Sequence, residues 1–173
     1  FYDNYKYLEL INNDDIDIIV WGAKNHANAK RNPEMFGWID PGKDNFINKI
    51  SVKKEINNDL SKPIVVGTFT FKNASVFKKS IELMITRQRL INNEFYIDSC
   101  INDAISLGYR CYFFEVDYFI SWGTPNDLRV FEYWQSAFHK WNYHPYEITN
   151  DRMINMNKVS VLKNEYEKFK PNF

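Results

Sequence analysis

The sequence predicts an α/β fold in which a mixed sheet is flanked by helices. Three observations support this. Runs of β-branched and aromatic residues alternate with segments whose apolar residues recur at helical spacing. Two adjacent strand-like segments are joined by a Pro-Gly turn, which predicts an antiparallel hairpin within the alternating pattern. The chain has 173 residues, enough for one domain with its own core.

The N-terminal part predicts one helix followed by strands. Apolar residues at helical spacing and a final Asn-Asn pair predict a short helix over residues 3–13. A β-branched run ending in Gly predicts a strand at 15–22 that is buried on both faces. A loop rich in small and basic residues follows over 22–34. The next strand is expected at 35–40, with its antiparallel partner at 46–54.

The middle of the chain predicts the longest elements. Residues 64–71 (IVVGTFTF) form the clearest strand pattern. Asn73 is expected to cap a helix that continues to about Arg89. A second helix is expected over 94–107, ended by Gly108 at the position where a left-handed residue commonly closes a helix.

The last third predicts one strand and one long helix. A strand is expected at 109–116, and a further strand or extended edge at 117–123. Thr124, followed by Pro and then by Asp at the third position, predicts a helix start. We therefore expect a main domain over 1–140 and a C-terminal arm, or the start of a further segment, over 141–173.

Composition excludes several classes of protein. Lys plus Arg equals Asp plus Glu at 22 each, which disfavours a nucleic-acid coat or an anionic-membrane binder. No apolar run reaches the roughly 18 residues of a membrane span. Cys100 and Cys111 are too few for a disulfide framework, and buried thiols in a reducing compartment are the simpler interpretation. With no signal peptide at the start of the sequence, a cytoplasmic location is expected.

The common catalytic motifs are absent. The six glycines form neither GxGxxG nor GxxxxGK[ST], the three histidines lack HExxH spacing, and no serine stands in GxSxG. Two glycines, Gly37 and Gly67, instead interrupt strands, where a missing side chain lets a ligand approach the backbone. A β-bulge or tight packing explains each of them equally simply.

Two charged patterns also allow a binding function. Glu94, Asp98 and Asn102 follow one another at i, i+4 and i+8 and fit either a solvated helix face or contacts to sugar hydroxyls or an amine. Basic clusters suit phosphate oxygens, with surface solubility as the alternative. These clusters are Lys53-Lys54 and the set Lys24, Lys30 and Arg31.

Three motifs in order resemble the sugar-phosphate nucleotidyltransferase family. They are RNPEMFGWID (31–40), ISVKK with PIVVGTFTF (50–71), and NEFYIDSCINDAISLG with FEVDYFISWGTPNDLRVFEYW (93–134). The resemblance covers most of residues 15–140, and WGTPNDL at 122–128 is its best hallmark. The last motif looks most like the nucleotidyl- and cytidylyltransferases of bacterial surface-polysaccharide clusters. The resemblance implies a Rossmann-like nucleotidyltransferase fold.

The resemblance also implies site residues. Gly37 stands where the family's Gly meets the sugar, and Lys54 at the family's phosphate-contacting Lys, which makes it the expected catalytic residue. Val65 and Gly67 match a segment that lines the substrate pocket, and Glu94 matches the segment before the substrate-side helix. The residue patterns above add Asp98 and Arg31 to this expected substrate site.

The chain departs from the family in two ways. The place of the family's second metal-binding Asp is taken by Ser121, a poor Mg²⁺ ligand, so nearby Asp117 or Glu115 becomes the candidate ligand. The family's N-terminal part, with its nucleotide loop and first metal-binding Asp, is not found, and the sequence opens on Phe1. We therefore expect a C-terminal portion that needs an N-terminal portion or a fused domain of the same protein.

The expected function is nucleotidyl transfer with Mg²⁺ as cofactor. An NTP, with CTP slightly preferred, would react with a small phosphate monoester such as a sugar phosphate and release pyrophosphate, for surface-polysaccharide precursors. One alternative is a non-catalytic ligand-binding or assembly module, suggested by Ser121. Another is a structural module whose aromatic surface packs on a fused domain.

Overall fold

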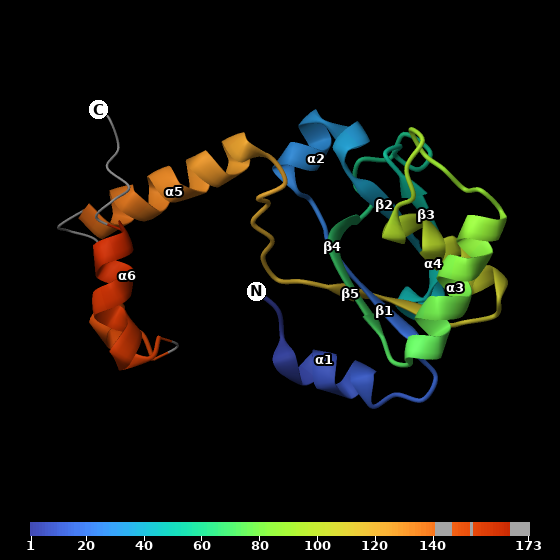
Figure 1. Cartoon of the computed structure of the whole chain (residues 1–173), viewed down its shortest axis with the longest axis horizontal. Coiled ribbons are helices and arrows are strands. Elements are labelled where there is room, and N and C mark those ends of the chain that lie inside the picture. Colours follow the sequence, from blue (N-terminus) through green and yellow to red (C-terminus); the bar gives the residue numbers. More distant parts are fainter. Residues whose placement is uncertain (141–146, 153, 167–173) are drawn as a thin grey trace. The chain divides into compact units, whose positions relative to one another are not determined.

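The computed structural model describes residues 1–140, 147–152 and 154–166 (Figure 1). The chain divides into two compact units, Phe1–Phe119 and Ile120–Phe173. Part of the arm expected over 141–173 lies outside the described residues, so the boundary expected at residue 140 stays a prediction. Among the described residues, no helix combines the length and the apolar content needed to cross a membrane.

The first unit is built on a five-stranded mixed sheet, which confirms the predicted fold class. Its strands follow the order β3-β2-β4-β1-β5. Strand β1 pairs parallel with β5 and antiparallel with β4, and β2 and β3 form the predicted hairpin. The strands are β1 (Ile18–Ala23), β2 (Gly37–Pro41), β3 (Ile47–Val52), β4 (Ile64–Phe71) and β5 (Cys111–Glu115).

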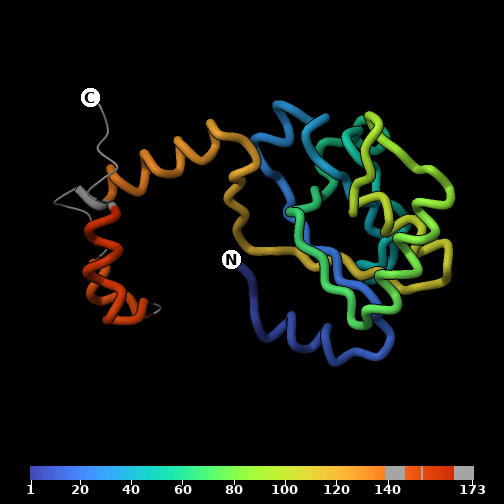
Figure 2. Tube along the Cα trace, in the orientation of Figure 1, coloured from blue at the N-terminus to red at the C-terminus, as the bar shows by residue number. Residues whose placement is uncertain are grey.

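Helices cover both faces of this sheet. On one face α3 (Ala74–Thr86) and α4 (Ile97–Ser106) lie side by side, and their apolar residues pack with Val20, Ile39 and Phe113 (Figure 1). On the other face α1 (Asn4–Ile11) packs against a second apolar cluster that includes Trp21 and Trp38. Figure 2 follows the trace from α1 into β1, one strand of the sheet that lies between the two helical layers.

Three helix boundaries follow the expected local chemistry. The Asn73 side chain accepts a hydrogen bond from the Ser75 N–H at 2.8 Å and caps α3. Gly108 follows α4 with a φ of +86°, the left-handed conformation that favours glycine. In the second unit, Thr124 Oγ1 accepts from the Asp127 N–H at 3.1 Å at the start of α5 (Pro125–Lys140).

Other elements differ from the expectation. The region expected as a loop over 22–34 contains α2 (Ala27–Arg31) and a 3₁₀ turn at Pro33–Met35, both too short to leave a periodic pattern. Residues 117–123 form no strand, because β5 ends at Glu115 and the chain continues without sheet pairing there. The remaining short elements are 3₁₀ turns at Lys43–Asn45, Ile148–Asn150 and Met156–Lys158, and α6 (Val159–Tyr166).

Helix α4 also starts later than expected. Asn92 and Asn93 both take positive φ values and close a tight turn in which Ile91 and Glu94 pair. Glu94 therefore lies before the helix, and the expected Glu94-Asp98-Asn102 stripe does not exist as one helix face. The buried face of α3 is narrower than predicted, because the Phe77 and Ile85 side chains expected on it are 39% and 51% exposed.

The side of β4 that faces away from β1 is largely unpaired. The Ile18 N–H and the Gly22 carbonyl both bond toward β5, so the residues of β1 between them, such as Ile19, bond to β4. Ile19 pairs with Thr70, and the backbone groups of Phe69 and Phe71 therefore point to the side of β4 that faces away from β1. On that side β2 reaches β4 only at the Trp38–Ile64 pair. Within the described residues, the backbone N–H and C=O groups of Phe69 and Phe71 have no partner on this edge.

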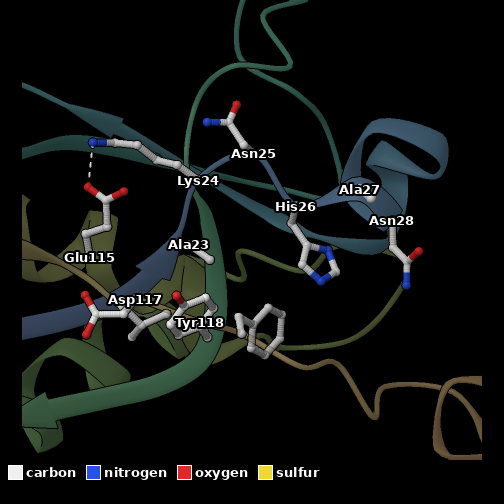
Figure 3. A pocket seen from close by; sticks show the side chains of 11 residues that line it. Ala23, Lys24, Asn25, His26, Ala27, Asn28, Glu115, Asp117 and Tyr118 are labelled. Carbon is white, nitrogen blue, oxygen red and sulfur yellow. Dashed lines mark hydrogen bonds and ion pairs between the residues drawn. The ribbon is translucent and has the colours of Figure 1, made fainter. Parts of the chain in front are cut away.

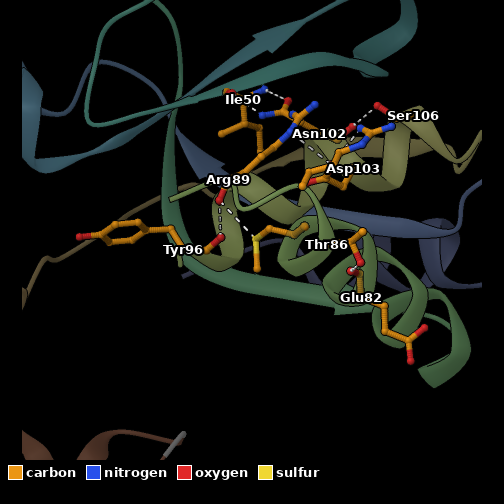
Figure 4. Close-up of polar contacts among 11 residues, drawn as sticks. Ile50, Glu82, Thr86, Arg89, Tyr96, Asn102, Asp103 and Ser106 are labelled. Atoms are coloured by element: carbon orange, nitrogen blue, oxygen red, sulfur yellow. Dashed lines mark hydrogen bonds and ion pairs between the residues drawn. The ribbon is translucent and has the colours of Figure 1, made fainter. Parts of the chain in front are cut away.

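Asn102 ties α4 to β3. Its side-chain amide donates to the Ile50 carbonyl and accepts from the Ile50 N–H, both at 2.8 Å (Figure 4). The pattern at residues 94–102 thus includes one residue with a structural role, because the amide completes the hydrogen bonding of a strand.

Replacing Asn102 should destabilise the fold. We expect Asn102→Ala to lower the free energy of unfolding by about 1–3 kcal/mol, because both Ile50 groups lose a partly buried partner. Ser106→Ala is the matched control: its exposed hydroxyl donates only to the Asn102 carbonyl within the same helix. Urea unfolding of the two variants measures the difference, and equal midpoints would contradict this role.

Candidate functional site

Three residues expected at the substrate site meet at one end of the sheet. Gly37 begins β2, Val65 lies in β4, and Asp98 lies in the first turn of α4. A Cβ atom at Gly37 would clash with Asp98 Oδ2 and would lie 3.3 Å from Val65 Cγ2. Glycine is thus required here for the close approach of the carboxylate to the strand backbone.

The environment of Asp98 disfavours its charge. Burial raises the pKa of this carboxyl, and a hydrogen bond from its own backbone N–H only partly opposes the effect. Asp98 forms no ion pair among the described residues, so a ligand that donates a hydrogen bond to this partly buried carboxylate stabilises it. This property is typical of a residue kept for binding.

Lys53, the neighbour of the expected catalytic residue Lys54, follows the residue of β3 that pairs with Gly37. Val52 pairs with Gly37 across the hairpin, and the Lys53 N–H donates to the Phe36 carbonyl at 2.9 Å. Lys53 takes a left-handed φ of +56°, which breaks the alternation of side chains at the end of β3. Lys54, the expected catalytic residue, is exposed.

The Lys53 ammonium interacts with an aromatic and an acidic side chain. Lys53 Nζ lies 5.0 Å from the centroid of the Tyr96 ring, and Tyr96 Oη donates to Glu94 Oε2 at 2.5 Å. Hydrogen bonding and charge interaction with Tyr96 raise the pKa of Lys53, with a smaller contribution from Glu94. The cluster of Lys53, Tyr96 and Glu94 therefore holds a positive charge one residue beyond the Val52–Gly37 pair, and it includes Glu94, an expected site residue.

Two other expected residues lie in different surroundings. Gly67 has a φ of +83° at a β-bulge, where the β1–β4 register shifts between Val20 and Gly22, and no heavy atom lies within 4 Å of its Cβ position. Arg31 is exposed at the end of α2 and donates to Asn28 Oδ1 at 2.5 Å. Neither is brought against Asp98 by the contacts that the described residues make.

A cavity of about 360 Å³ opens at the same end of the sheet (Figure 3). It is lined by residues 23–28 and 115–119, which are the last residues of the parallel strands β1 and β5 and the segments that follow them. Ligands commonly bind at such ends in open α/β sheets. Lys24 Nζ and Glu115 Oε2 form an ion pair of 2.6 Å on its wall, and the His26 ring packs 5.1 Å from that of Phe119.

The described residues do not fit a magnesium site. Asp117, the candidate metal ligand, is exposed on the cavity wall, and its neighbour Glu115 is paired with Lys24. Ser121 Oγ, at the place of the family's Asp, accepts from the Gly123 N–H at 3.2 Å. No group of three or more His, Cys, Asp or Glu side chains that could hold a metal occurs among the described residues.

Comparison with known proteins supports the fold. No protein-family model and no curated protein matches the chain. Among solved structures, it is similar to a nucleoside-diphosphate-sugar pyrophosphorylase from Vibrio cholerae RC9, with a TM-score of 0.57 and 13% sequence identity. The match covers 76% of this chain and 49% of the Vibrio protein, so the chain spans about half the length of that neighbour. Over the matched part, the chain therefore shares the fold of that nucleoside-diphosphate-sugar pyrophosphorylase.

Proposed function

We propose that this chain carries the acceptor-binding part of a nucleotidyltransferase. The acceptor is a small phosphate monoester such as a sugar phosphate, and the donor is an NTP, with CTP the first to test. The observation that carries the proposal is the meeting of Gly37, Val65 and Asp98 from three separate elements. The nucleotidyltransferase-type fold agrees with it.

The proposed chemistry is a single displacement at phosphorus. An oxygen of the acceptor phosphate attacks the α-phosphorus of the NTP, a new P–O bond forms, and the bond to the bridging oxygen breaks to release pyrophosphate. Lys53 binds and orients the acceptor phosphate by its charge, while Asp98 accepts a hydrogen bond from an acceptor hydroxyl. Gly37 lets the acceptor approach the strand backbone.

Other parts of the reaction require groups beyond this site. Mg²⁺ would supply charge stabilisation for the phosphates. Since the described residues do not fit a magnesium site, we propose that the carboxylates that bind Mg²⁺ come from outside them. We propose the same source, an N-terminal portion or a fused domain, for the nucleotide-binding residues. A cytoplasmic location and a role in surface-polysaccharide precursors complete the proposal.

Pyrophosphate release and binding test the proposal together. The chain is incubated with Mg²⁺, each of CTP, UTP, ATP, GTP and dTTP, and glucose 1-phosphate. Calorimetry measures binding of glucose 1-phosphate alone. Binding without turnover supports an acceptor part that needs a nucleotide-binding portion. Absence of binding by the folded chain overturns the proposal.

Lys53 and Lys54 can be separated by matched substitutions. Lys53→Met is expected to weaken glucose 1-phosphate binding about tenfold, because a charge-assisted contact to phosphate is lost. Lys54→Met removes the same charge from the adjacent, exposed position and is expected to change binding less than about twofold. A larger loss of binding in Lys54→Met than in Lys53→Met would show that Lys54, the residue that the family resemblance indicates, binds the phosphate.

A non-catalytic binding module is the second candidate. Ser121 in place of a carboxylate favours it, as does the lack of an acidic cluster among the described residues. Metal-independent binding of an acceptor, with no pyrophosphate release by the longest form of the protein, would support this alternative over the enzyme.

A further inference from the structure

Arg87, Arg89 and Asp103 form a charged cluster between the end of α3 and helix α4. Asp103 is completely buried, and its Oδ1 atom lies 3.1 Å from Arg87 Nη1 and 3.5 Å from Arg89 Nε (Figure 4). The two arginine side chains are 40% and 42% exposed, so a ligand can reach both. Among the described residues that line the cavity, none belongs to this cluster.

The backbone after α3 holds both arginines in a defined turn. The Gln88 N–H donates to the Ile85 carbonyl at 3.0 Å. The Arg89 N–H donates to the Met84 carbonyl at 3.3 Å. These two bonds form a Schellman motif, in which glycine commonly takes the left-handed position. Gln88 takes that position here, with a φ of +49°. Because the turn fixes the backbone on both sides of Gln88, the two arginine side chains start from fixed points.

The buried carboxylate of Asp103 holds two like charges close together. A buried ion pair is often no more stabilising than apolar residues of similar volume, because its charges lose their water. Asp103 Oδ2 also has no hydrogen-bond partner among the described residues. An apolar residue would fill this place in α4 without that cost. Two guanidinium groups oriented by one supporting acid are typical of a prepared binding site.

The two guanidinium groups are spaced to hold one tetrahedral anion. Because both approach the same oxygen of Asp103, Arg87 Nη1 and Arg89 Nε lie at most about 7 Å apart. One phosphate group can accept from both, since each charge-assisted N–H···O contact spans about 2.8 Å and two phosphate oxygens bridge the rest. Arg87 Nη2 and both Nη groups of Arg89 donate no hydrogen bond to the described residues. These nitrogens are the donors left for a ligand.

The local charge favours an anion. Two arginines and one carboxylate leave one net positive charge on the cluster. The other carboxylates of α3 and α4 are Glu82, which lies 4.0 Å from Lys78, and Asp98, whose pKa is raised by burial. Guanidinium groups match phosphate through their planar, paired donors. We propose that Arg87 and Arg89 together bind one phosphate group at a second anion site, additional to the proposed acceptor site.

NMR of the whole chain tests the proposal with inorganic phosphate. We expect phosphate, but not chloride at equal ionic strength, to shift the Nε–Hε signals of Arg87 and Arg89 saturably. Arg87→Gln and Arg89→Gln assign these signals, and each should weaken phosphate binding about tenfold, because one charge-assisted contact is lost. Lys78→Gln removes an exposed positive charge from α3 and should change binding less than about twofold.

Conservative variants keep the test decisive if a glutamine variant does not fold. Arg87→Lys and Arg89→Lys retain the charge next to Asp103 and should still weaken phosphate binding, because an ammonium lacks the paired planar donors. Circular dichroism melting confirms that each variant folds. Binding of phosphate by both lysine variants as tightly as by the unmodified chain overturns the proposal.

A substitution at Lys53 separates this site from the acceptor site. Lys53→Met should leave both arginine signals responding to phosphate. Loss of that response would assign the phosphate to the acceptor site and overturn this proposal alone. Unmoved arginine signals in the unmodified chain, or an equal response to chloride, also overturn it without contradicting acceptor binding. Methyl phosphate distinguishes the ligands: equal binding indicates a phosphate ester, and binding about tenfold weaker indicates the free anion.

Discussion

Removing both guanidinium groups at Arg87 and Arg89 is expected to lower the free energy of unfolding by about 3–5 kcal/mol. Asp103 of α4 is completely buried, and its Oδ1 lies 3.1 Å from Arg87 Nη1 and 3.5 Å from Arg89 Nε. Its other oxygen, Oδ2, has no hydrogen-bond partner among the described residues. Loss of both cations therefore leaves a buried carboxylate without compensation.

A compensating substitution provides the control. In the background that lacks both arginines, Asp103→Leu removes the buried charge and should recover most of the lost stability. Urea unfolding of the double and triple variants measures the recovery. If the triple variant is no more stable than the double, the arginines act by packing rather than by neutralising Asp103.

Asp98→Asn is expected to increase stability at neutral pH while weakening acceptor binding about tenfold. Burial raises the pKa of Asp98 in the folded chain above its unfolded value. Between the two values the folded state binds more protons, so stability falls as the pH rises through this window and then stays constant. The asparagine has no charge to desolvate and removes that loss.

The pH dependence of thermal melting separates this effect from a general one. Between about pH 3 and pH 7, the gain in melting temperature from Asp98→Asn should grow with pH. Asp59→Asn is the opposite control: hydrogen bonds from Ser61 lower the pKa of Asp59, so its replacement should cost stability as the pH rises. A loss of stability from Asp98→Asn at pH 7 would show a structural carboxylate instead.

The sequence predicted best those elements that are determined by interactions between residues close in sequence. The β2–β3 hairpin, the Asn73 cap and the Gly108 helix end each depend on residues within a few positions of one another. The start of α4 was predicted wrongly because Asn92 and Asn93 form a tight turn with left-handed backbone. A run of polar residues does not predict such a turn. Short elements such as α2 leave too few positions for a period to appear.

The sequence predicted some residues of the candidate site and missed others. Gly37, Val65 and Asp98 were singled out by their family resemblance or spacing, and the fold brings them together. Lys54 was chosen over Lys53 because it stands at the phosphate-contacting Lys of the family that the sequence resembles, and the left-handed backbone at Lys53 could not be predicted from the sequence. The pairing of Lys24 with Glu115 depends on β1 lying next to β5, and no local pattern encodes that neighbourhood.

The unpaired side of β4 presents backbone groups of Phe69 and Phe71 that have no partner among the described residues. Unpaired amide groups along a strand are a template on which another extended chain can add, and lysine or proline commonly protects such edges. Between Val66 and Phe71 the strand contains neither of these residues, and Lys72 follows only at its end. The bulge at Gly67 interrupts the regular strand, a feature that opposes the addition of another strand at an unpaired side.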